Sequence, residues 1–280
     1  MVTTIPKDVS ESQWRAIRHR DSHLLILIPP GESKIQTLVH RVNYLSQNLK
    51  ENQCITVIVS NDKTAAEMHK FFEGQVYVER CSFMVGTFHQ LCLQFLRDYV
   101  EHTYLPMEFK VGTPFEVEGF IKREWTYLKD KEIRAALKRI SIWKSSCCQG
   151  EVPNEINQYN NVLKRRNLID SDDVFLEFWR LLKNNEDILQ EVQNYFYHIF
   201  VDEYQNMNQL QQALLQMLAE SSTNITAFAN PEYIAGKLHM TRVQFSKNFA
   251  KNFPGARVQE IVADECSTSH LPHIVRSNLK

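Results

Sequence analysis

Two neighbouring carboxylates, Asp202 and Glu203, directly follow the mostly apolar segment Tyr197–Val201. If that segment is a buried strand of a parallel sheet, both carboxylates lie at the carboxyl edge of the sheet, where ligands bind in open α/β sheets. In such a site the aspartate can hold Mg²⁺ and the glutamate can polarise an attacking water. The alternative is that the pair only caps a helix predicted from about residue 208 to 219, because acidic side chains are common at helix starts.

The segments that would position these carboxylates alternate between strand and helix patterns. Strands are predicted at residues 24–28, 54–59, about 76–85, 198–201 and 224–229, and helices at 11–17, 34–49, 64–72 and between 86 and 99. Leu24–Ile28 is apolar throughout, as expected of a strand buried on both faces. Ser10 and Gln13 have the spacing of a capping box before the first helix. This alternation predicts the α/β class with a parallel, doubly wound sheet.

The pattern changes to helices and loops between about residues 106 and 194. This part of the chain is rich in lysine and arginine, and its basic residues are interleaved with Trp125, Tyr127 and Trp143. The chain is therefore predicted to consist of a first part of the α/β domain at residues 1–104, an inserted helical subdomain at 105–194, and a second part of the α/β domain at 195–280. The insert is a candidate for nucleic-acid contacts, and the alternative is an amphipathic helix with solvated lysines and core tryptophans.

The composition is that of a globular protein and narrows the function classes. The 280 residues carry a formal net charge of -1 and are 43% hydrophobic, so any contact with nucleic acid has to be local. No apolar run approaches the roughly 20 residues that span a bilayer, and the first ten residues lack the pattern of a secretory signal. The six cysteines include no Cys-x-x-Cys pair, which argues against a structural zinc site. We expect an intracellular protein, nuclear or cytoplasmic, that is neither secreted nor bound to a membrane.

Several collinear segments resemble the UvrD/Rep-type superfamily-one DNA helicases. Phe200–Gln211 corresponds to the family signature Leu-Val-Asp-Glu-Phe-Gln-Asp-Thr-Asn-x-x-Gln, and Gly86–Cys92 corresponds to Gly-Thr-Phe-His-x-Leu. Asn252–Ala256 matches the stretch before the fourth motif, and Leu38–Leu45 matches the helix after the phosphate loop. These matches cover almost the whole chain.

The resemblance implies a fold, two cofactors and a set of site residues. The fold would be a RecA-like P-loop NTPase sheet with helices on both faces and an inserted, mostly helical subdomain. The cofactors would be ATP and Mg²⁺. The residues at the family's nucleotide-binding positions are Gln13, Gly31, Ser33 and Lys34; those at its catalytic positions are Asp202 (also the Mg²⁺ ligand), Glu203 and Gln205; and those at its DNA-contacting positions are Lys63, Thr87 and His89.

The phosphate loop departs from the family pattern Ala-Gly-x-Gly-x-Gly-Lys-Thr. Lys34 is retained, but Ile35 replaces the threonine whose hydroxyl would bind Mg²⁺, and Ser33 replaces a glycine. Pro29 and Pro30 have no N–H to donate to a phosphate. Together these changes argue against tight binding of Mg²⁺-ATP. For Lys34 the alternative is a solvated lysine in the first turn of a helix.

Other family positions are also altered. Leu238 and Ser267 stand where the third and fourth motifs have arginine, and Ser60, Ala235 and Lys237 stand where the family has aromatic side chains that stack on DNA bases. A complete helicase also needs a second RecA-like domain. The sequence stops at Lys280, just after the fourth-motif position, so we expect either a fragment of a longer chain or a half-helicase that cannot translocate alone. A missing second domain or another protein partner is therefore expected, and single-stranded or forked DNA is a possible ligand.

Three hypotheses remain open at this point. The first is a UvrD/Rep-like module with weakened or lost ATPase and unwinding activity, acting as a DNA-associated or protein-binding pseudo-helicase. The second is an active ATP-dependent 3'-5' DNA helicase domain that is completed by a second RecA-like domain. The third is a protein-interaction scaffold without a nucleic-acid role. The sequence does not decide whether the chain is an enzyme.

Overall fold

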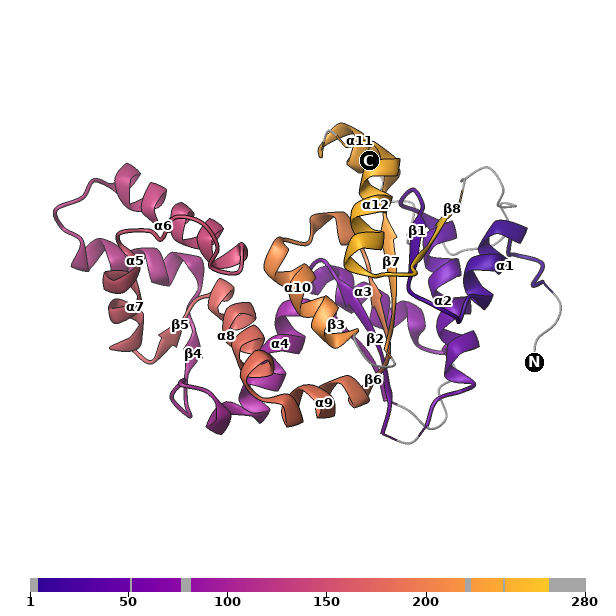
Figure 1. Ribbon diagram of the computed structural model, residues 1–280, viewed down its shortest axis with the longest axis horizontal. Helices are drawn as coiled ribbons and strands as arrows, with labels where there is room; N and C mark the ends of the chain where they lie inside the picture. The colour runs from indigo at the N-terminus through magenta and orange to yellow at the C-terminus, as the bar shows by residue number, and fades with distance from the viewer. Residues whose placement is uncertain (1–4, 51, 77–81, 220–222, 239, 262–280) are drawn as a thin grey trace. The chain divides into compact units, whose positions relative to one another are not determined.

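The computed structural model describes residues 5–50, 52–76, 82–219, 223–238 and 240–261. The chain forms two compact units, the first made of residues 1–86, 193–206 and 219–280, and the second of residues 87–192 and 207–218. Figure 1 labels the helices and strands of both. The predicted division at residues 105 and 194 stays a prediction.

The first unit is built on a six-stranded sheet with the strand order β3-β2-β6-β7-β1-β8. Its strands are β1 (Leu24–Leu27), β2 (Cys54–Val59), β3 (Ser82–Thr87), β6 (Phe196–Val201), β7 (Asn224–Ala229) and β8 (Arg257–Glu260). The four pairings with a described register, β1 with β7, β1 with β8, β2 with β6, and β6 with β7, are all parallel. The prediction of a parallel α/β sheet is confirmed. The edge strand β8 was not predicted, because Arg257, Gln259 and Glu260 give it no apolar run.

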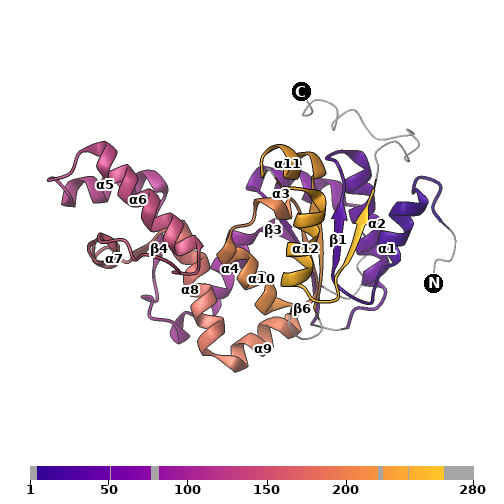
Figure 2. The same ribbon diagram turned by 45° about the horizontal axis from the view of Figure 1, so that its top comes forward.

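Helices flank this sheet (Figure 2). They are α1 (Glu11–Arg18), α2 (Glu32–Ser46), α3 (Asp62–Phe72), α11 (Pro231–Gly236) and α12 (Arg242–Asn252), with a 3₁₀ turn η2 (Tyr204–Asn206) after β6. The predicted capping box is present, since the Ser10 hydroxyl accepts from the Gln13 N–H and the Gln13 side chain accepts from the Ser10 N–H. Apolar residues of α2, α3 and the central strands form one buried cluster, which fixes the start of α2 against the sheet.

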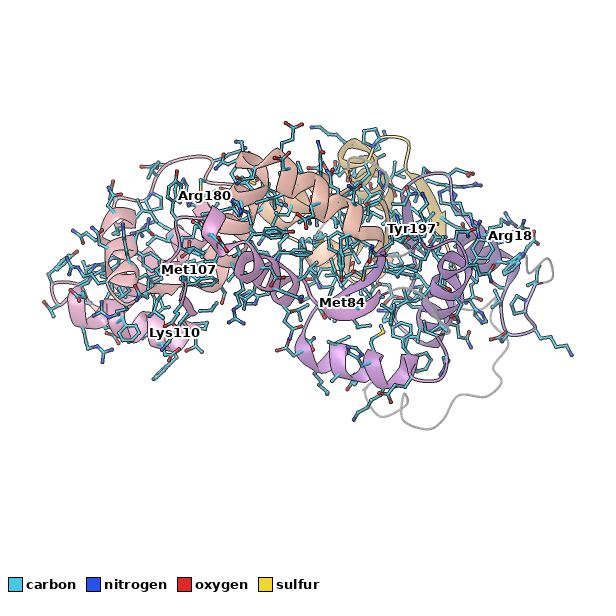
Figure 3. The ribbon with its side chains drawn as sticks, turned by 90° about the horizontal axis from the view of Figure 1, so that it is seen from below. Arg18, Met84, Met107, Lys110, Arg180 and Tyr197 are labelled. Atoms are coloured by element: carbon cyan, nitrogen blue, oxygen red, sulfur yellow. The ribbon has the colours of Figure 1, made fainter. Side chains whose placement is uncertain are left out.

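The second unit is mostly helical, as predicted for the greater part of its length. It contains α4 (Phe88–Asp98), η1 (Val100–His102), α5 (Pro114–Glu124), α6 (Asp130–Ser145), α7 (Ile156–Lys164), α8 (Ser171–Asn184), most of α9 (Glu186–Tyr195) and α10 (Gln209–Leu218). It also contains a two-stranded parallel ladder of β4 (Lys110–Val111) and β5 (Leu168–Ile169), which was not predicted because each strand has only two residues. Figure 3 marks Lys110 at the surface of this unit. Trp125 belongs to its buried core.

Membrane-spanning helices are not found in the part of the chain that the structure describes, where no helix combines the required length and apolar character.

Candidate nucleotide site

Asp202 lies directly after β6, and its backbone N–H donates to Ile58 O over 2.8 Å, which continues the pairing with β2. Its carboxylate receives Lys34 Nζ at 2.8 Å from Oδ1 and 3.0 Å from Oδ2. Oδ1 also accepts from the Glu203 N–H at 2.9 Å. The side chains of Lys34 and Asp202 are 15% and 7% exposed, so the ion pair is largely withdrawn from water. The structure therefore brings together two residues that stand 168 positions apart in the sequence.

Asp202 and Glu203 do not cap the helix that follows them. The cap of α10 is Asn208, whose Oδ1 accepts from the Gln211 N–H at 2.9 Å, while its own N–H donates to Gln211 Oε1 at 3.0 Å. The capping alternative is therefore wrong, and the solvated-lysine alternative for Lys34 is wrong as well, because that side chain is held by Asp202.

Glu203 has a backbone φ of 51°, in the left-handed region that non-glycine residues rarely adopt. Such a conformation costs on the order of 1–3 kcal/mol and persists only where the surroundings enforce it. Its side chain is half-buried, and Oε2 accepts from Asn206 Nδ2 at 3.0 Å. The two neighbouring carboxylates therefore have different partners, Lys34 for Asp202 and Asn206 for Glu203.

Gln205 is buried, and its Oε1 accepts from the Asn230 N–H at 3.3 Å. This bond joins the turn after β6 to the residue that directly follows β7. Asn230 also caps α11 through a bond from the Glu232 N–H to its Oδ1. The supporting role of Asn230 was not predicted, although an asparagine between an apolar strand and Pro231 is a recognisable helix start.

The loop before α2 is held from several sides. Gly31 has φ 145° and ψ -167°, a conformation in the half of the backbone map that favours glycine, and it offers no side-chain cap to α2. Ser33 O accepts from Gln13 Nε2 at 3.1 Å and from Thr37 Oγ1 at 2.7 Å. Ile35 packs against the apolar cluster of the sheet. The three residues 33–35 are thus each fixed to a different part of the unit.

Gln13 is fully buried on α1, and its amide is used inside the protein. Its Oε1 accepts from the Ser10 N–H at 2.9 Å, and its Nε2 donates to Ser33 O and to Thr37 Oγ1. The residue expected to recognise adenine therefore also connects α1 to the first turn of α2. Its nucleotide-binding role stays a prediction.

The three candidate DNA contacts belong to different units. Lys63 is exposed on α3 in the first unit, with its Nζ 3.9 Å from Glu67 Oε1. Thr87 and His89 belong to the second unit. Thr87 caps α4 in a capping box with Gln90, and the His89 ring contacts the Phe175 ring edge-on at 5.8 Å. These local roles account for Thr87 and His89 without DNA, so their DNA-binding role stays a prediction.

Of the other altered motif positions, Ser60 is exposed directly after β2, and the rest lie on or just after α11 or outside the described residues. Ala235, Lys237 and Leu238 are exposed. The fourth-motif segment that includes Ser267 lies outside the residues that the structure describes.

Most basic residues of the insert that were expected to supply positive charge have acidic partners. Glu118 and Asp130 pair with Lys122 and Arg134, Glu155 pairs with Arg139, and Glu124 pairs with Arg165 and Arg166. Lys144 is not on the surface at all, since it is buried between Asp170 and Asp173. The expectation that Lys144 adds to a basic surface is wrong, and the positive charge of the insert is smaller than a count of lysines and arginines indicates.

Comparison with known proteins shows which family has this sequence pattern. Residues 9–233 match the family described as the UvrD/REP helicase N-terminal domain. The chain belongs to this family. It is similar to the ATP-dependent DNA helicase PcrA of Staphylococcus epidermidis, with 24% identity over all of this chain and 41% of that protein. It is also similar to DNA helicase II of Escherichia coli, with 26% identity over 96% of this chain and 40% of that protein. The chain thus spans about two-fifths of the length of these curated relatives.

The UvrD/REP family implies ATP and Mg²⁺, and the residues around Lys34 supply only part of a site for them. Position 35 has no hydroxyl for Mg²⁺, because isoleucine replaces threonine there, and the half-buried Ile35 side chain packs against the core cluster. Pro29 and Pro30 remove two backbone donors from the loop. Asp202 already accepts three hydrogen bonds, two of them from Lys34. The donor set therefore fits a closed ion pair better than a triphosphate with its metal.

Proposed function

We propose that this chain is a UvrD/Rep-type helicase module in which ATP hydrolysis and unwinding are weakened or lost, and that it works as a DNA-associated or protein-binding pseudo-helicase. The observation that carries the proposal is the contact between Lys34 and Asp202, beside Ile35, an apolar and half-buried side chain at the position where a hydroxyl ligand for the metal is expected. A phosphate group needs the Lys34 ammonium, and a magnesium ion needs the Asp202 carboxylate, so both ligands compete with the same ion pair. The loop lacks the N–H donors at Pro29 and Pro30 and the hydroxyl at position 35, so a bound nucleotide would gain few contacts to offset the loss of the ion pair.

The direct test is turnover of radiolabelled ATP by the full-length protein with single-stranded DNA present. We expect a rate at least about 100-fold below that of a UvrD/Rep-type helicase assayed alongside, since loss of one preorganised electrostatic contact alone costs about 10²–10³ in rate. The matched control is Glu203→Gln, which removes the candidate base; any residual rate should be unchanged in this variant. A rate typical of the family that Glu203→Gln abolishes would overturn the proposal.

A repaired loop gives a second control. The variant Ser33→Gly/Ile35→Thr returns the family's glycine and hydroxyl to the loop. If the substitutions in the loop cause the defect, the repaired protein should gain Mg²⁺-dependent nucleotide binding, measured as a nucleotide-induced rise in Tm. No gain in the repaired protein would place the cause elsewhere in the molecule.

The rival function is an active ATP-dependent 3'-5' helicase domain completed by a second RecA-like domain. It is favoured by the survival of Lys34, Asp202 and Glu203 together at one edge of the sheet. It requires magnesium-dependent nucleotide binding by the wild-type protein. Calorimetry without detectable ATP binding at millimolar ligand would exclude it.

Binding of forked or single-stranded DNA separates the DNA-associated form from a pure protein scaffold. We expect binding that weakens with salt, and Lys63→Ala should reduce the slope of log K against log salt by about 1 if Lys63 contacts a phosphate. Fluorescence anisotropy over a range of salt concentrations measures both. Lys251→Ala, at an exposed lysine of α12, is the matched control. Absence of any salt-sensitive DNA binding would favour the scaffold.

A further inference from the structure

The Lys34–Asp202 pair has the geometry of a permanent connection rather than of a passing surface contact. Lys34 Nζ is within hydrogen-bond distance of both carboxylate oxygens, at 2.8 and 3.0 Å, and both side chains are largely buried. Exposed pairs contribute little because water screens them, whereas a buried partner left alone is strongly unfavourable. Neither residue can therefore leave the other without a replacement of opposite charge.

The residues on either side of Lys34 are also committed. The carbonyl of Ser33 accepts from Gln13 of α1 and from Thr37, and the half-buried Ile35 packs against the core cluster of the sheet. In a phosphate loop, the N–H groups of the first turn of the helix and the lysine point at the ligand. Here three consecutive residues bind this turn to α1, to the end of β6 and to the core.

We propose that the Lys34–Asp202 pair is an internal lock, which takes the place of phosphate and metal in joining α2 to β6 and keeps the site in a nucleotide-free form. This inference rests on the proposed function, because an active ATPase would have to break the pair in every cycle. It goes further in giving the pair a task of its own. On this inference the link between the two residues holds the first unit together without a bound ligand.

A double-mutant cycle in the full-length protein tests the lock. The variants are Lys34→Met, Asp202→Asn and the two combined. Each single change should lower Tm by about 4–8 °C, because it leaves a partner buried without its counter-charge, and the double variant should lose much less than the sum of both. The matched control is the exposed pair Lys63–Glu67, where Lys63→Met and Glu67→Gln should each leave Tm nearly unchanged and show no coupling.

The second measurement is the effect of Mg²⁺-ATP on Tm. Millimolar Mg²⁺-ATP should leave the Tm of the wild-type protein unchanged, because the ligand would have to open the pair. Single variants that unfold at the wild-type temperature, or additive losses in the double variant, would overturn the lock. A clear rise in wild-type Tm with Mg²⁺-ATP would also overturn it. Failure of the proposed function is recognised separately, by a family-like rate of ATP turnover, and leaves the outcome of the mutant cycle to stand on its own.

Discussion

Replacement of Arg41 with alanine is expected to lower the free energy of unfolding of the first unit by about 4 kcal/mol. Arg41 lies on α2, and its side chain is fully buried. Its Nη1 lies 2.5 Å from Ala16 O, 3.1 Å from Ile17 O and 2.7 Å from His19 O. The guanidinium therefore binds the last carbonyls of α1, where the helix dipole favours a positive charge.

The other end of Arg41 reaches the sheet. Its Nε donates to Thr226 Oγ1 at 2.9 Å, and Thr226 Oγ1 lies 2.7 Å from Nε2 of His198. Burial, and then the charge of Arg41, lowers the pKa of His198 well below its ordinary value. The imidazole is therefore neutral, and its Nε2 can accept a hydrogen bond from the Thr226 hydroxyl. Alanine at position 41 would leave several buried acceptors without a donor and disconnect α1 from β7.

Hydrogen exchange measured by mass spectrometry gives a local readout for this prediction. Peptides that cover α1 should lose protection in Arg41→Ala, and Gln13, which holds the carbonyl of Ser33, should lose its fixed position with them. Arg15→Ala is the matched control, because Arg15 is an exposed arginine of α1 that pairs only with Glu11 among the described residues. Equal loss of protection in both variants would refute a special role for Arg41.

The strands of the sheet could be predicted where burial alone determines the residue type. β2 and β7 were predicted with their observed bounds, because a central parallel strand is buried on both faces and therefore apolar along its length. Among the described strands, β8 lies at the edge of the sheet beside β1 and is mostly exposed, so nothing in its composition distinguishes it from a loop.

The position of Asp202 at the carboxyl edge of the sheet could be predicted from the sequence, but the contacts of its side chain could not. Since β6 and β1 are separated only by β7 and run in the same direction, the residues after them share one edge of the sheet. Asp202 was a candidate because it follows a predicted strand, whereas Lys34 was a candidate because it stands at the lysine of the family's phosphate loop. Whether the lysine would face a ligand or the aspartate depends on side-chain geometry, which spacing does not encode.

The burial of Lys144 has a signal in the spacing of the residues around it. Ile133, Ala136, Ile140 and Lys144 follow one another at intervals of three or four residues, and all are buried on α6. Lys144 therefore falls on the apolar stripe of its helix, which predicts a buried lysine. Its partners could not be predicted from α6 alone, because they come from the start of α8.

Replacement of Lys144 with methionine is expected to lower the free energy of unfolding of the second unit by about 3–5 kcal/mol near pH 8. Nζ of Lys144 lies 2.7 Å from Asp170 Oδ2 and 2.6 Å from Asp173 Oδ1. The Tyr159 hydroxyl also donates a hydrogen bond to Asp170, and the Lys144 ammonium lies 4.8 Å from the centre of the Tyr159 ring. The group joins α6, α7 and the start of α8, so methionine leaves two buried carboxylates without a cation.

The loss of stability in Lys144→Met should depend on pH, because Asp170 and Asp173 titrate differently without the lysine. Burial, together with the charge of Asp170, raises the pKa of Asp173 to about 6, although Lys144 opposes this shift. Without the lysine, the pKa of Asp173 in the folded protein rises further, and that of Asp170, which Lys144 helps to hold low, rises as well. The pKa values in the unfolded chain stay at their ordinary values. The folded variant then binds a proton that the unfolded chain has released, so its stability is greatest in acid and falls as the pH rises through the folded pKa. The difference from wild type should therefore be larger at pH 8 than at pH 5.

Urea unfolding at both pH values, followed by tryptophan fluorescence, measures this difference. Trp125, Trp143 and Trp179 belong to the second unit, so a Trp14→Phe background makes the signal specific to it. Lys131→Met is the matched control, because Lys131 is an exposed lysine of the same helix and should change stability by less than about 0.5 kcal/mol. A Lys144→Met penalty that is equal at pH 5 and pH 8 would mean that its cost comes from packing alone, and that the two aspartates do not depend on the lysine for their charge.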